Sequence, residues 1–441
     1  MILVDTALRK RAEKGLPVMV AMVGAGAIGR GVASQIINHA PGMRLAVIAN
    51  RTLENAIKAL EVSGVTEWKA VSNVTELNDC IARGIIAVTD DLLLVCEADA
   101  IEVVMEVLSD VEIVGKVALH AFAHGKHYLT MNAEADATFG LELRTRAEAA
   151  GVIYSVADGD QPGLEMNLWR YVKGLGLEPL VCGNIKGLQD CRRNPTTQEG
   201  FAKKWNQGTK MVTSFADGTK ISFEQACVAN ATGMCVEQRG MRGGDFPGTV
   251  EELRDSGRYD VEKLRKLGGV VDYVVGAQPA AGVFVLAAHD DPFHRFNLKL
   301  YKMGEGPLYA FYAHTHLCYF EVPSSLARLV LFRDTTIAAK EHKVDVVTIA
   351  KTDLKAGTVL DGIGGYHTDG VCGNIGPSLS GKMLPMGLSE GCRLRRDIRC
   401  DEVIGYDDVE VPEGRLSDSL RKATIDRCMA GSRHLEAFSN R

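Results

Sequence analysis

Apolar and polar positions along the first third of the chain follow the rhythm of alternating strands and helices. Val18, Val20 and Met22 form an apolar run that predicts a strand, and apolar residues three or four apart around Ile36 predict the helix after it. The same alternation continues to about residue 157. Further strands are expected at 45–49, 92–95, 100–107, 128–131 and 152–157, and helices at 111–124 and 139–150. This order predicts an α/β domain with a doubly wound parallel sheet of the Rossmann type.

The pattern changes after residue 157, and the remainder predicts two further domains. Residues 158–340 are expected to form an α+β domain that binds substrate and makes the dimer. Its strands are predicted near 184 and at 271–275, 282–287, 296–301 and 317–321, and its helices at 165–172, 221–232 and 324–339. Residues 343–415 predict a small β-rich domain. Its apolar runs are at 344–349, 356–360, 384–388 and 407–411, and a surface helix with a loose end is expected at 415–441.

Composition and charge exclude several classes of function. The 441 residues are 46% hydrophobic and 24% charged, which is typical of a globular chain. No apolar stretch reaches the roughly 20 residues of a membrane span, and residues 1–16 lack the apolar core of a secretory signal. The net charge of −6, without a basic block, argues against a nucleic-acid partner. The 11 cysteines form no Cys-x-x-Cys pair and are interpreted as reduced thiols, so a cytoplasmic protein is expected.

A glycine-rich turn joins the first predicted strand to the first predicted helix. Its residues, which we expect to bind a dinucleotide, are Gly24, Ala25, Gly26, Ala27, Ile28 and Gly29. The first two glycines would leave room for a pyrophosphate at the helix N-terminus, and the third would let helix and strand pack closely. Because the turn lies between a strand and a helix, it predicts a dinucleotide-binding fold more specifically than the motif alone.

The residues after the second predicted strand bear on the choice of cofactor. An NAD-binding domain places an acidic residue here to accept a hydrogen bond from the ribose 2′-hydroxyl. This chain has Asn50, Arg51 and Thr52 instead. Arg51 can neutralise a 2′-phosphate that a carboxylate would repel, so NADP(H) is predicted in preference to NAD(H). The alternative is that Arg51 only caps a solvated turn, which leaves the cofactor open.

Several segments taken together resemble homoserine dehydrogenase over residues 1–340. The glycine turn, the strand that leads to Glu106, and the segment 125–132 carry the resemblance, as do Asp217 and Lys220 ahead of an apolar helix. The resemblance implies a catalytic lysine close to Lys220. It also implies three cofactor contacts, namely Glu106, Asn132 and Glu134.

The C-terminal part of the chain narrows this resemblance to one subfamily. Residues 350–357, 360–362 and 384–388 are similar to the SAF module. The chain therefore resembles the homoserine dehydrogenase relatives that carry this module, one class of which is the deoxyxylulose-5-phosphate reductoisomerase-like enzyme of bacterial isoprenoid synthesis. Homoserine dehydrogenases have a lysine directly after the asparagine of their Thr-x-Asn segment, where this chain has Ala133. The missing lysine argues against plain homoserine oxidation.

Hydride transfer to a carbonyl needs a group that stabilises or protonates the developing alkoxide. Lys220 is the first candidate, because it follows a tight Asp-Gly turn at the head of a predicted helix. Asp217 would orient Lys220 or hold a metal-bound substrate, and Lys186, at a strand end, would contact substrate oxygens. The alternative is that Lys220 is only an exposed lysine of the turn and that Asp217 is an ordinary turn residue.

Other polar candidates lie within the second domain and at its start. A divalent metal is a second candidate cofactor, and its ligands are not assigned. Oxygen ligands for it are offered by Asp158, Asp160 and Glu165. The alternative is that these acids cap the next helix. Asp160 is also a catalytic candidate. His316 is a candidate acid or base and His314 a candidate substrate contact, both on a segment interpreted as a strand, unless they are structural. A polar loop offers basic residues that clamp a phosphate or form a solvated face, among them Arg193, Lys204 and Lys210.

These observations predict an NADP-dependent oxidoreductase that acts on a small phosphorylated hydroxy-carbonyl compound. The specific expectation is reductoisomerase-like chemistry on a 1-deoxy-D-xylulose-5-phosphate type of substrate, which would serve isoprenoid precursor synthesis. One alternative is a dehydrogenase of homoserine, another semialdehyde or a sugar acid. An alternative from another class is a non-catalytic nucleotide- or sugar-binding protein. A homo-oligomer, either a dimer or a tetramer, is also expected.

Overall fold

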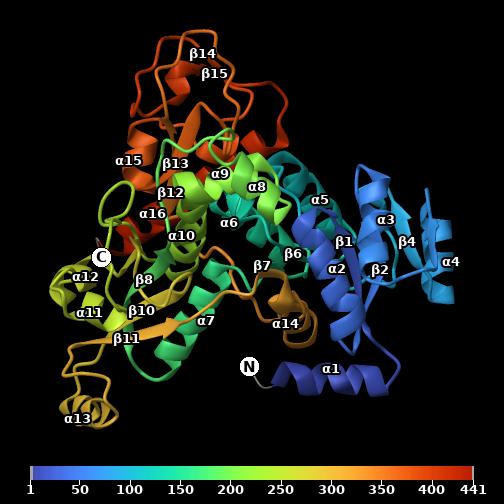
Figure 1. Ribbon diagram of the computed structural model, residues 1–441, viewed down its shortest axis with the longest axis horizontal. Coiled ribbons are helices and arrows are strands. Elements are labelled where there is room, and N and C mark those ends of the chain that lie inside the picture. The colour runs from blue at the N-terminus through green and yellow to red at the C-terminus, as the bar shows by residue number, and fades with distance from the viewer. Residues whose placement is uncertain (1–2, 440–441) are drawn as a thin grey trace. The chain divides into compact units, whose positions relative to one another are not determined.

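The computed structural model describes residues 3–439, with side chains through residue 430, and divides the chain into two compact units (Figure 1). Unit 1 consists of Met1–Asp160, Leu317–Ala338 and Ser419–Thr424, and unit 2 of Gln161–His316, Ala339–Asp418 and Ile425–Arg441. The chain therefore leaves each unit and returns to it. No helix of the described residues has both the length and the apolarity that crossing a membrane requires. The three-domain division of the sequence stays a prediction.

Unit 1 is built on a seven-stranded sheet in the order β3-β4-β2-β1-β5-β6-β7, in which every neighbouring pair is parallel. The strands are β1 (Val18–Val23), β2 (Met43–Ala49), β3 (Trp68–Ala70), β4 (Ile86–Thr89), β5 (Val103–Glu106), β6 (His127–Thr130) and β7 (Tyr154–Val156). The helices between them are α2 (Ala27–His39), α3 (Leu53–Val62), α4 (Val74–Arg83), α5 (Val111–Ala123) and α6 (Ala133–Ala149), and α1 (Leu3–Glu13) precedes β1. The predicted doubly wound parallel sheet is confirmed. Strand order reverses on either side of β1, so its carboxyl end marks the expected ligand position.

Polar caps start the helices at the carboxyl edge of this sheet. The side chains of Asp110 and Asn132 accept N–H groups in the first turns of α5 and α6. The prediction of a strand at 92–95 is wrong, because Asp91 accepts two following N–H groups at 2.9 and 3.3 Å and turns the chain into the 3₁₀-helix η1 (Leu94–Cys96). The strand of this region is β4, which the sequence analysis missed.

The chain returns to unit 1 through a run of short helices. They are η2 (Cys318–Glu321), α14 (Val322–Ala327) and the π-helix η3 (Arg328–Phe332). The predictions of a strand at 317–321 and of one helix at 324–339 are therefore wrong. The helix ends early because Arg333 takes a left-handed φ of 51°, and Ile337 then pairs with Val156 of β7.

Unit 2 contains a four-stranded sheet in the order β11-β10-β8-β9, parallel between β8 and β9 and antiparallel elsewhere. The strands are β8 (Glu178–Lys186), β9 (Val270–Val275), β10 (Val283–Ala288) and β11 (Leu308–Ala313). The helices are α7 (Gln161–Gly174), α8 (Glu199–Trp205), α9 (Thr209–Asp217), α10 (Thr219–Thr232), α11 (Val250–Asp255), α12 (Val261–Leu267) and α13 (Pro292–Leu300). All residues of α10 from Thr219 to Ala231 are buried, so α10 is the central helix of this α+β unit.

The prediction of a strand at 296–301 is wrong, because this segment lies in α13. The side chain of Asp291 accepts the N–H of His294 at 2.9 Å and Pro292 begins the helix, which is a strong start signal. The strand of the region is β11, which follows α13 and was missed. His314 lies in the loop after β11 and not on a strand.

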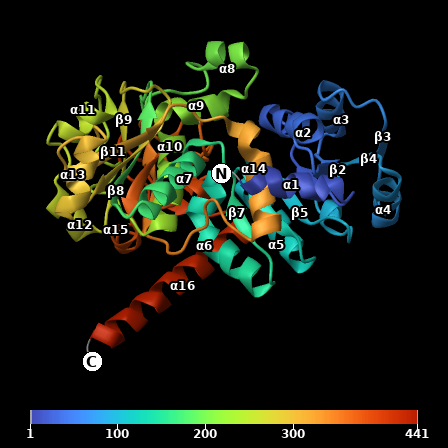
Figure 2. The same cartoon turned by 90° about the horizontal axis from the view of Figure 1, so that it is seen from below.

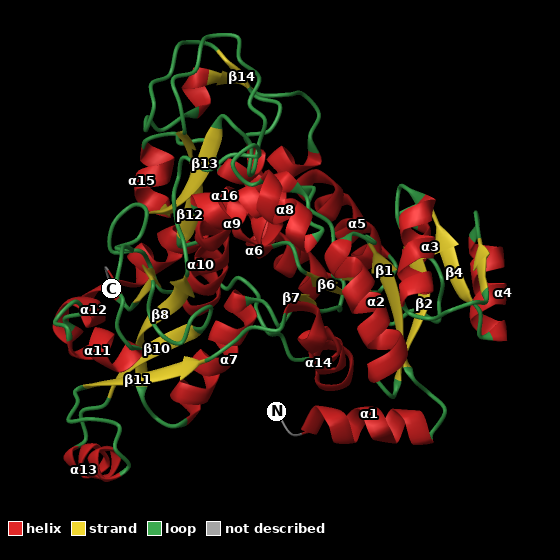
Figure 3. Ribbon diagram, in the orientation of Figure 1, coloured by secondary structure: helices red, strands yellow, loops and turns green. Residues whose placement is uncertain are grey.

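Residues 339–418 belong to unit 2 and consist mostly of loops (Figure 3). The regular elements are β12 (Val344–Ala350), β13 (Thr368–Asn374), α15 (Ile375–Ser380), the 3₁₀-helices η4 (Met386–Leu388) and η5 (Tyr406–Asp408), β14 (Arg393–Leu394) and β15 (Val409–Glu410). The run at 344–349 is a strand as predicted. The runs at 356–360 and 384–388 are not, because turns and a 3₁₀-helix leave them only isolated bridges to other segments, and the run at 407–411 contributes only two strand residues. The likeness to an SAF module stays a prediction.

The chain closes with the helix α16 (Leu416–Ser439), which Figure 2 shows as one continuous helix. A helix was predicted here, but its first turns are not simply on the surface, because Leu420 and Thr424 are fully buried. The predicted loose end at 440–441 lies outside the described residues.

Candidate functional sites in the two units

The glycine turn follows β1 and opens α2 at the carboxyl edge of the unit 1 sheet. Gly24 has a φ of +102°, and a Cβ there would lie 2.4 Å from the carbonyl oxygen of Val107. A Cβ at Gly29 would lie 2.5 Å from the carbonyl oxygen of Gly24, so close packing requires glycine at both positions. A Cβ at Gly26 would meet no atom within 4 Å, and no side chain caps the first turn of α2. The turn therefore leaves open backbone at a helix N-terminus, which fits a dinucleotide pyrophosphate.

Asn50 holds this turn from the end of β2. Its Oδ1 accepts a hydrogen bond from the N–H of Ala25 at 3.0 Å, and its Nδ2 donates to the carbonyl oxygen of Thr52 at 2.7 Å. Thr52 itself occupies the N-cap position of α3 without a side-chain hydrogen bond. Arg51 is exposed and has no side-chain hydrogen bond or ion pair with any described residue. Asn50 is therefore a supporting residue of the turn, and Arg51 is available to a ligand.

Glu106, the last residue of β5, is completely buried beside the glycine turn's strand. Burial raises its pKa to about 8, and the nearby charge of Glu134 acts in the same direction. Two hydrogen bonds oppose this rise. The hydroxyl of Thr130 donates to Oε2 at 2.5 Å, and the N–H of Leu108 donates to Oε1. The Glu106 carboxyl is therefore mostly protonated at neutral pH.

Asn132 and Glu134 begin α6 at the same edge of the sheet. The Oδ1 of Asn132 accepts the N–H of Ala135 at 2.6 Å, and its Nδ2 donates to the carbonyl oxygen of Leu108 at 3.0 Å. Glu134 and Ala133 are buried in the first turn. Glu106 and Asn132 thus make hydrogen bonds inside unit 1, and their contact with a cofactor stays a prediction.

Asp158 and Asp160 follow β7 in unit 1. Asp158 accepts the N–H of Gly159 at 2.9 Å, and its other oxygen lies 3.6 Å from the guanidinium of Arg328. Asp160 lies 3.9 Å from the thiol of Cys318. The ion pair with Arg328 neutralises Asp158 and makes it a poor metal ligand.

The first candidate of the sequence, Lys220, lies in the first turn of α10 in unit 2. It is 8% exposed and therefore is not an exposed turn lysine. Its Nζ lies 3.3 Å from Oε1 of the buried Glu224, one turn further along the helix. The Nδ2 of Asn184 from β8 donates to Glu224 at 3.4 Å. Glu224 was missed, although its spacing of four residues from Lys220 is the signal that could have identified it.

Glu165 from α7 packs against the same helix. The Nε2 of Gln225 donates to its carboxyl at 3.1 Å. Burial raises the pKa of Glu165 well above its ordinary value, and the charge of Glu224 adds to the rise, so the neutral acid is favoured. The role of Glu165 as a metal ligand stays a prediction.

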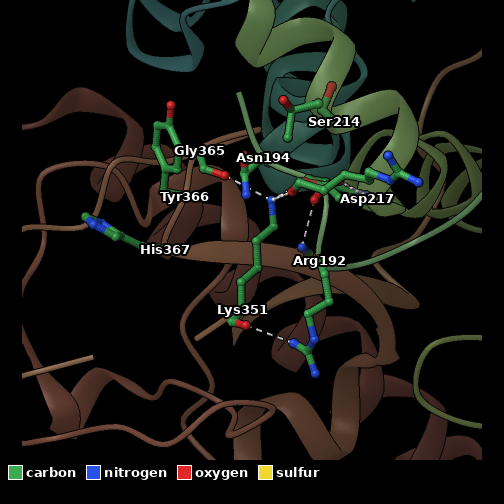
Figure 4. A network of polar contacts seen from close by, with 12 residues as sticks. Arg192, Asn194, Ser214, Asp217, Lys351, Gly365, Tyr366 and His367 are labelled. Carbon is green, nitrogen blue, oxygen red and sulfur yellow. Dashed lines mark hydrogen bonds and ion pairs between the residues drawn. The ribbon is translucent and has the colours of Figure 1, made fainter. Parts of the chain in front are cut away.

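Asp217 ends α9 and pairs with Lys351 from the C-terminal segment rather than with Lys220 (Figure 4). The Nζ of Lys351 lies 2.6 Å from Oδ2 of Asp217, and both side chains are buried. The other oxygen of Asp217 accepts the N–H of Thr219 at 2.8 Å. Burial raises the pKa of Asp217, whereas the Lys351 ammonium and these hydrogen bonds lower it in part. Sequence reasoning included Lys351 in the SAF-like segment but had no signal for its partner, 134 residues away.

The predicted basic residues of unit 2 lie at separate places. Lys186 ends β8, is half-buried and makes no side-chain hydrogen bond or ion pair with a described residue. Arg193 pairs with an aspartate three residues earlier at 3.0 Å, and Lys210 donates to a backbone carbonyl at 2.6 Å. Lys204 is exposed on α8 and lies over the indole ring of the next residue. Lys186 and Lys204 are therefore the two of these cations without an acidic or carbonyl partner among the described residues.

The two predicted histidines lie in the loop that follows β11. The ring of His314 lies against that of Tyr312, and Nδ1 of His316 lies 3.0 Å from the carbonyl oxygen of Ala281. The hydrogen bond holds the His316 ring to the turn before β10. A catalytic role for either histidine stays a prediction.

Comparison with known protein families defines the class of the chain. Residues 24–157 match the NAD-binding domain of homoserine dehydrogenase, and residues 159–322 match the catalytic domain of the oxidoreductase DRL. With the seven-stranded parallel sheet and its glycine turn, these matches define an NAD(P)-dependent oxidoreductase. More particularly, it joins a homoserine dehydrogenase type of NAD-binding domain to a DRL type of catalytic domain. No curated protein matched the chain in sequence.

Solved structures with similarity to parts of the chain have low identity. A 1-deoxy-D-xylulose 5-phosphate reductoisomerase from Zymomonas mobilis, in complex with NADPH, is 12% identical over 71% of this chain and 80% of that chain, with a TM-score of 0.37. A biliverdin reductase from Synechocystis, in complex with biliverdin and NADP⁺, is 16% identical over 40% and 49%, with a TM-score of 0.28. A scyllo-inositol dehydrogenase from Lactobacillus casei is 13% identical over 42% and 49%, with a TM-score of 0.29. The chain thus spans less than half the length of the last two neighbours.

Proposed function

We propose that the chain is an NADP-dependent oxidoreductase that reduces a small phosphorylated hydroxy-carbonyl compound, in the manner of 1-deoxy-D-xylulose-5-phosphate reductoisomerase. The observation that carries the proposal is the buried ammonium of Lys220, paired with Glu224 inside the matched catalytic domain. A lysine in this state can protonate the alkoxide that forms when a carbonyl is reduced. The proposal assigns the chain to the synthesis of isoprenoid precursors.

The residues of unit 1 fit NADP(H), which would supply the hydride. The open backbone at Gly26 would receive the pyrophosphate, and Asn50 would keep the turn in position. Arg51 would neutralise the 2′-phosphate, because it is exposed and has no side-chain hydrogen bond or ion pair with a described residue. NADP(H) would therefore bind more tightly than NAD(H), which lacks that phosphate.

Lys220 would hold the proton that the substrate oxygen receives. The carboxylate of Glu224 at 3.3 Å favours the charged ammonium, and burial strengthens its attraction to a developing negative charge. The substrate phosphate would be bound by basic residues of unit 2. The candidates are Lys186, Arg193, Lys204 and Lys210.

A divalent metal would assist a skeletal rearrangement of the substrate. Of the three acids named for it in the sequence, Asp158 is paired with Arg328, and Asp160 and Glu165 remain the candidates. No step is assigned to a metal. Activity measured with EDTA and with added Mg²⁺ decides whether one is needed.

The test follows oxidation of the reduced nicotinamide by absorbance. NADPH and NADH are each combined with 1-deoxy-D-xylulose 5-phosphate, other ketose phosphates and an amino-acid semialdehyde, and NADP⁺ with homoserine. We expect turnover with NADPH and a ketose phosphate, and its loss in Lys220→Met. Lys266→Met, which changes an exposed lysine of α12, is the matched control and should behave as the wild type. Failure of every carbonyl compound to oxidise NADPH would refute the proposal.

Two other functions remain as alternatives with separate outcomes. A homoserine or semialdehyde dehydrogenase is favoured by the match of residues 24–157, although Ala133 replaces the expected lysine. Oxidation of homoserine at an ordinary enzymatic rate would establish it. A nucleotide- or sugar-binding protein would bind NADPH without turnover, and Lys220→Met would change nothing.

We also propose that the chain forms a homo-oligomer, either a dimer or a tetramer. The strand β11 lies at the edge of the unit 2 sheet, where its outer backbone groups can pair with a second copy. Light scattering at micromolar concentration tests this, and a monomer would refute it.

A further inference from the structure

The C-terminal segment 339–418 contacts the first turn of α10 at several positions. The N–H of Gly370 in β13 donates to Oγ1 of Thr219 at 3.0 Å, and the thiol of Cys372 donates to the carbonyl oxygen of Ser222 at 2.9 Å. Lys351, directly after β12, reaches the aspartate that precedes this helix. The β12–β13 hairpin therefore fixes the end of α10 that carries Lys220.

Lys351 uses its ammonium to join three separate segments of unit 2. Its Nζ donates to Oδ2 of Asp217 at 2.6 Å, to the carbonyl oxygen of Arg193 at 2.9 Å and to that of Gly365 at 3.0 Å (Figure 4). A lysine ammonium has three protons, and each has one acceptor here. The side chain is almost completely buried, so water cannot replace these contacts at low cost.

Asp217 transmits this contact to the start of α10. One of its oxygens bonds Lys351 and the other accepts the N–H of Thr219, the first residue of the helix. Gly218 between them takes a left-handed φ of 91°, so the chain reverses direction at this point. Lys220 is the next residue. Its position relative to Glu224 therefore depends on Asp217 remaining in place.

We propose that Lys351 is a positioning residue that, through Asp217, holds the ammonium of Lys220 in its working position. The C-terminal segment thereby completes the catalytic site of unit 2. This inference rests on the proposed function, in which Lys220 supplies the proton.

The first test compares Lys351→Met with the matched control Lys355→Met. Lys355 lies in the same segment but is exposed and pairs only at the surface, so its variant should behave as the wild type. In Lys351→Met we expect kcat to fall about 100-fold, the loss typical of a small misplacement of a catalytic group. The KM for NADPH should stay unchanged, because the glycine turn belongs to unit 1.

The second test is rescue by the double variant Asp217→Asn/Lys351→Met. An asparagine can still accept the N–H of Thr219 but leaves no unpaired buried charge. We expect this variant to fold and to recover at least about tenfold in kcat over Lys351→Met, since the loss acts through Asp217. If Lys351→Met fails to fold, the double variant alone is compared with Lys220→Met. A folded double variant as inactive as Lys220→Met would overturn the inference, because Lys351 would then act by another route.

A readout independent of turnover separates this inference from the proposed function. Acetylation of Lys220 by sulfo-NHS-acetate, followed by mass spectrometry, measures how accessible its amine is. We expect about tenfold faster labelling in Lys351→Met than in the wild type or Lys355→Met, as for the opening of a buried pair. Unchanged labelling together with unchanged kcat would overturn the inference. No turnover by the wild type would refute the proposed function alone, and the labelling rates would still decide what Lys351 does.

Discussion

Replacing Glu106 by glutamine tests whether a buried acid at the carboxyl edge of the unit 1 sheet is protonated in the folded chain. The pKa of this carboxyl rises from 4.5 to about 8 because it is completely buried. One pKa unit corresponds to about 1.4 kcal/mol, so this shift can change the free energy of unfolding by at most about 5 kcal/mol between acidic and alkaline pH. Glu106→Gln keeps the size of the side chain and resembles the neutral acid, which can bond both Thr130 and Leu108.

The sign of the pH dependence follows from proton uptake. Below pH 4.5 the carboxyl is protonated in both the folded and the unfolded chain, and its contribution to stability is complete. Between pH 4.5 and about 8 only the folded chain holds the proton, so the free energy of unfolding falls as the pH rises. Above about 8 the loss is complete. Relative to Glu106→Gln, the wild type should therefore lose about 3 to 5 kcal/mol between mildly acidic and mildly alkaline pH.

Urea unfolding of unit 1 measures this difference. Trp68 in β3 reports on unit 1 when Trp169 and Trp205, both in unit 2, are replaced by phenylalanine. The wild-type and Glu106→Gln curves are compared at several pH values, with Glu61→Gln, an exposed glutamate of α3, as the control. If Glu106→Gln and the wild type lose stability in parallel as the pH rises, Glu106 is ionised when folded and the reasoning is wrong.

Four other substitutions test single positions. Arg51→Ala should raise the Kd of NADPH by roughly tenfold or more and leave that of NADH unchanged, measured by calorimetry, since only NADPH has a 2′-phosphate. Gly24→Ala should lower the unfolding free energy of unit 1 by about 1 to 3 kcal/mol through backbone strain, whereas Gly26→Ala should leave stability unchanged and weaken NADPH binding. Equal effects of the two glycine variants would contradict the geometry of the turn. Glu224→Gln should lower kcat, because it removes the carboxylate that lies 3.3 Å from the ammonium of Lys220; an unchanged kcat would show that the pair is not used.

The sheet of unit 1 was predictable because its signals are local. The strands β1, β2 and β5 are short apolar runs, and the helices α5 and α6 begin at the polar caps Asp110 and Asn132, a few residues after a strand. The segment 296–301 shows where such reasoning fails. Its apolar residues alternate with polar ones, which is the pattern of a strand, but Phe293, Phe296 and Leu300 also share one face of a helix. The deciding signal lay upstream, in the cap at Asp291 and the proline after it.

The candidate site divides in the same way between local and distant contacts. Lys220 was predicted from its turn, and its partner Glu224 lies one helical turn away, within reach of sequence reasoning. The partner of Asp217 was not within reach of sequence reasoning, because Lys351 is 134 residues further along the chain. No periodicity relates two positions that the tertiary fold brings together. The sequence therefore predicted that Asp217 would orient Lys220 or hold a metal-bound substrate, but it did not predict the ion pair of Asp217 with Lys351.

The residues around α10 are buried, and this burial limits how many charged groups can lie beside the two lysine–carboxylate pairs. Of the buried lysines, Lys220 lies within ion-pair distance of Glu224, and Lys351 lies within ion-pair distance of Asp217. The acids beside these pairs respond to burial by holding a proton: the pKa of Glu165 is raised well above its ordinary value, and that of Asp369 is raised to about 7. A second carboxylate beside either lysine would add an uncompensated buried charge, whereas a neutral acid adds none. The raised pKa values of these acids therefore limit the number of buried negative charges around α10, where the two lysine–carboxylate pairs lie.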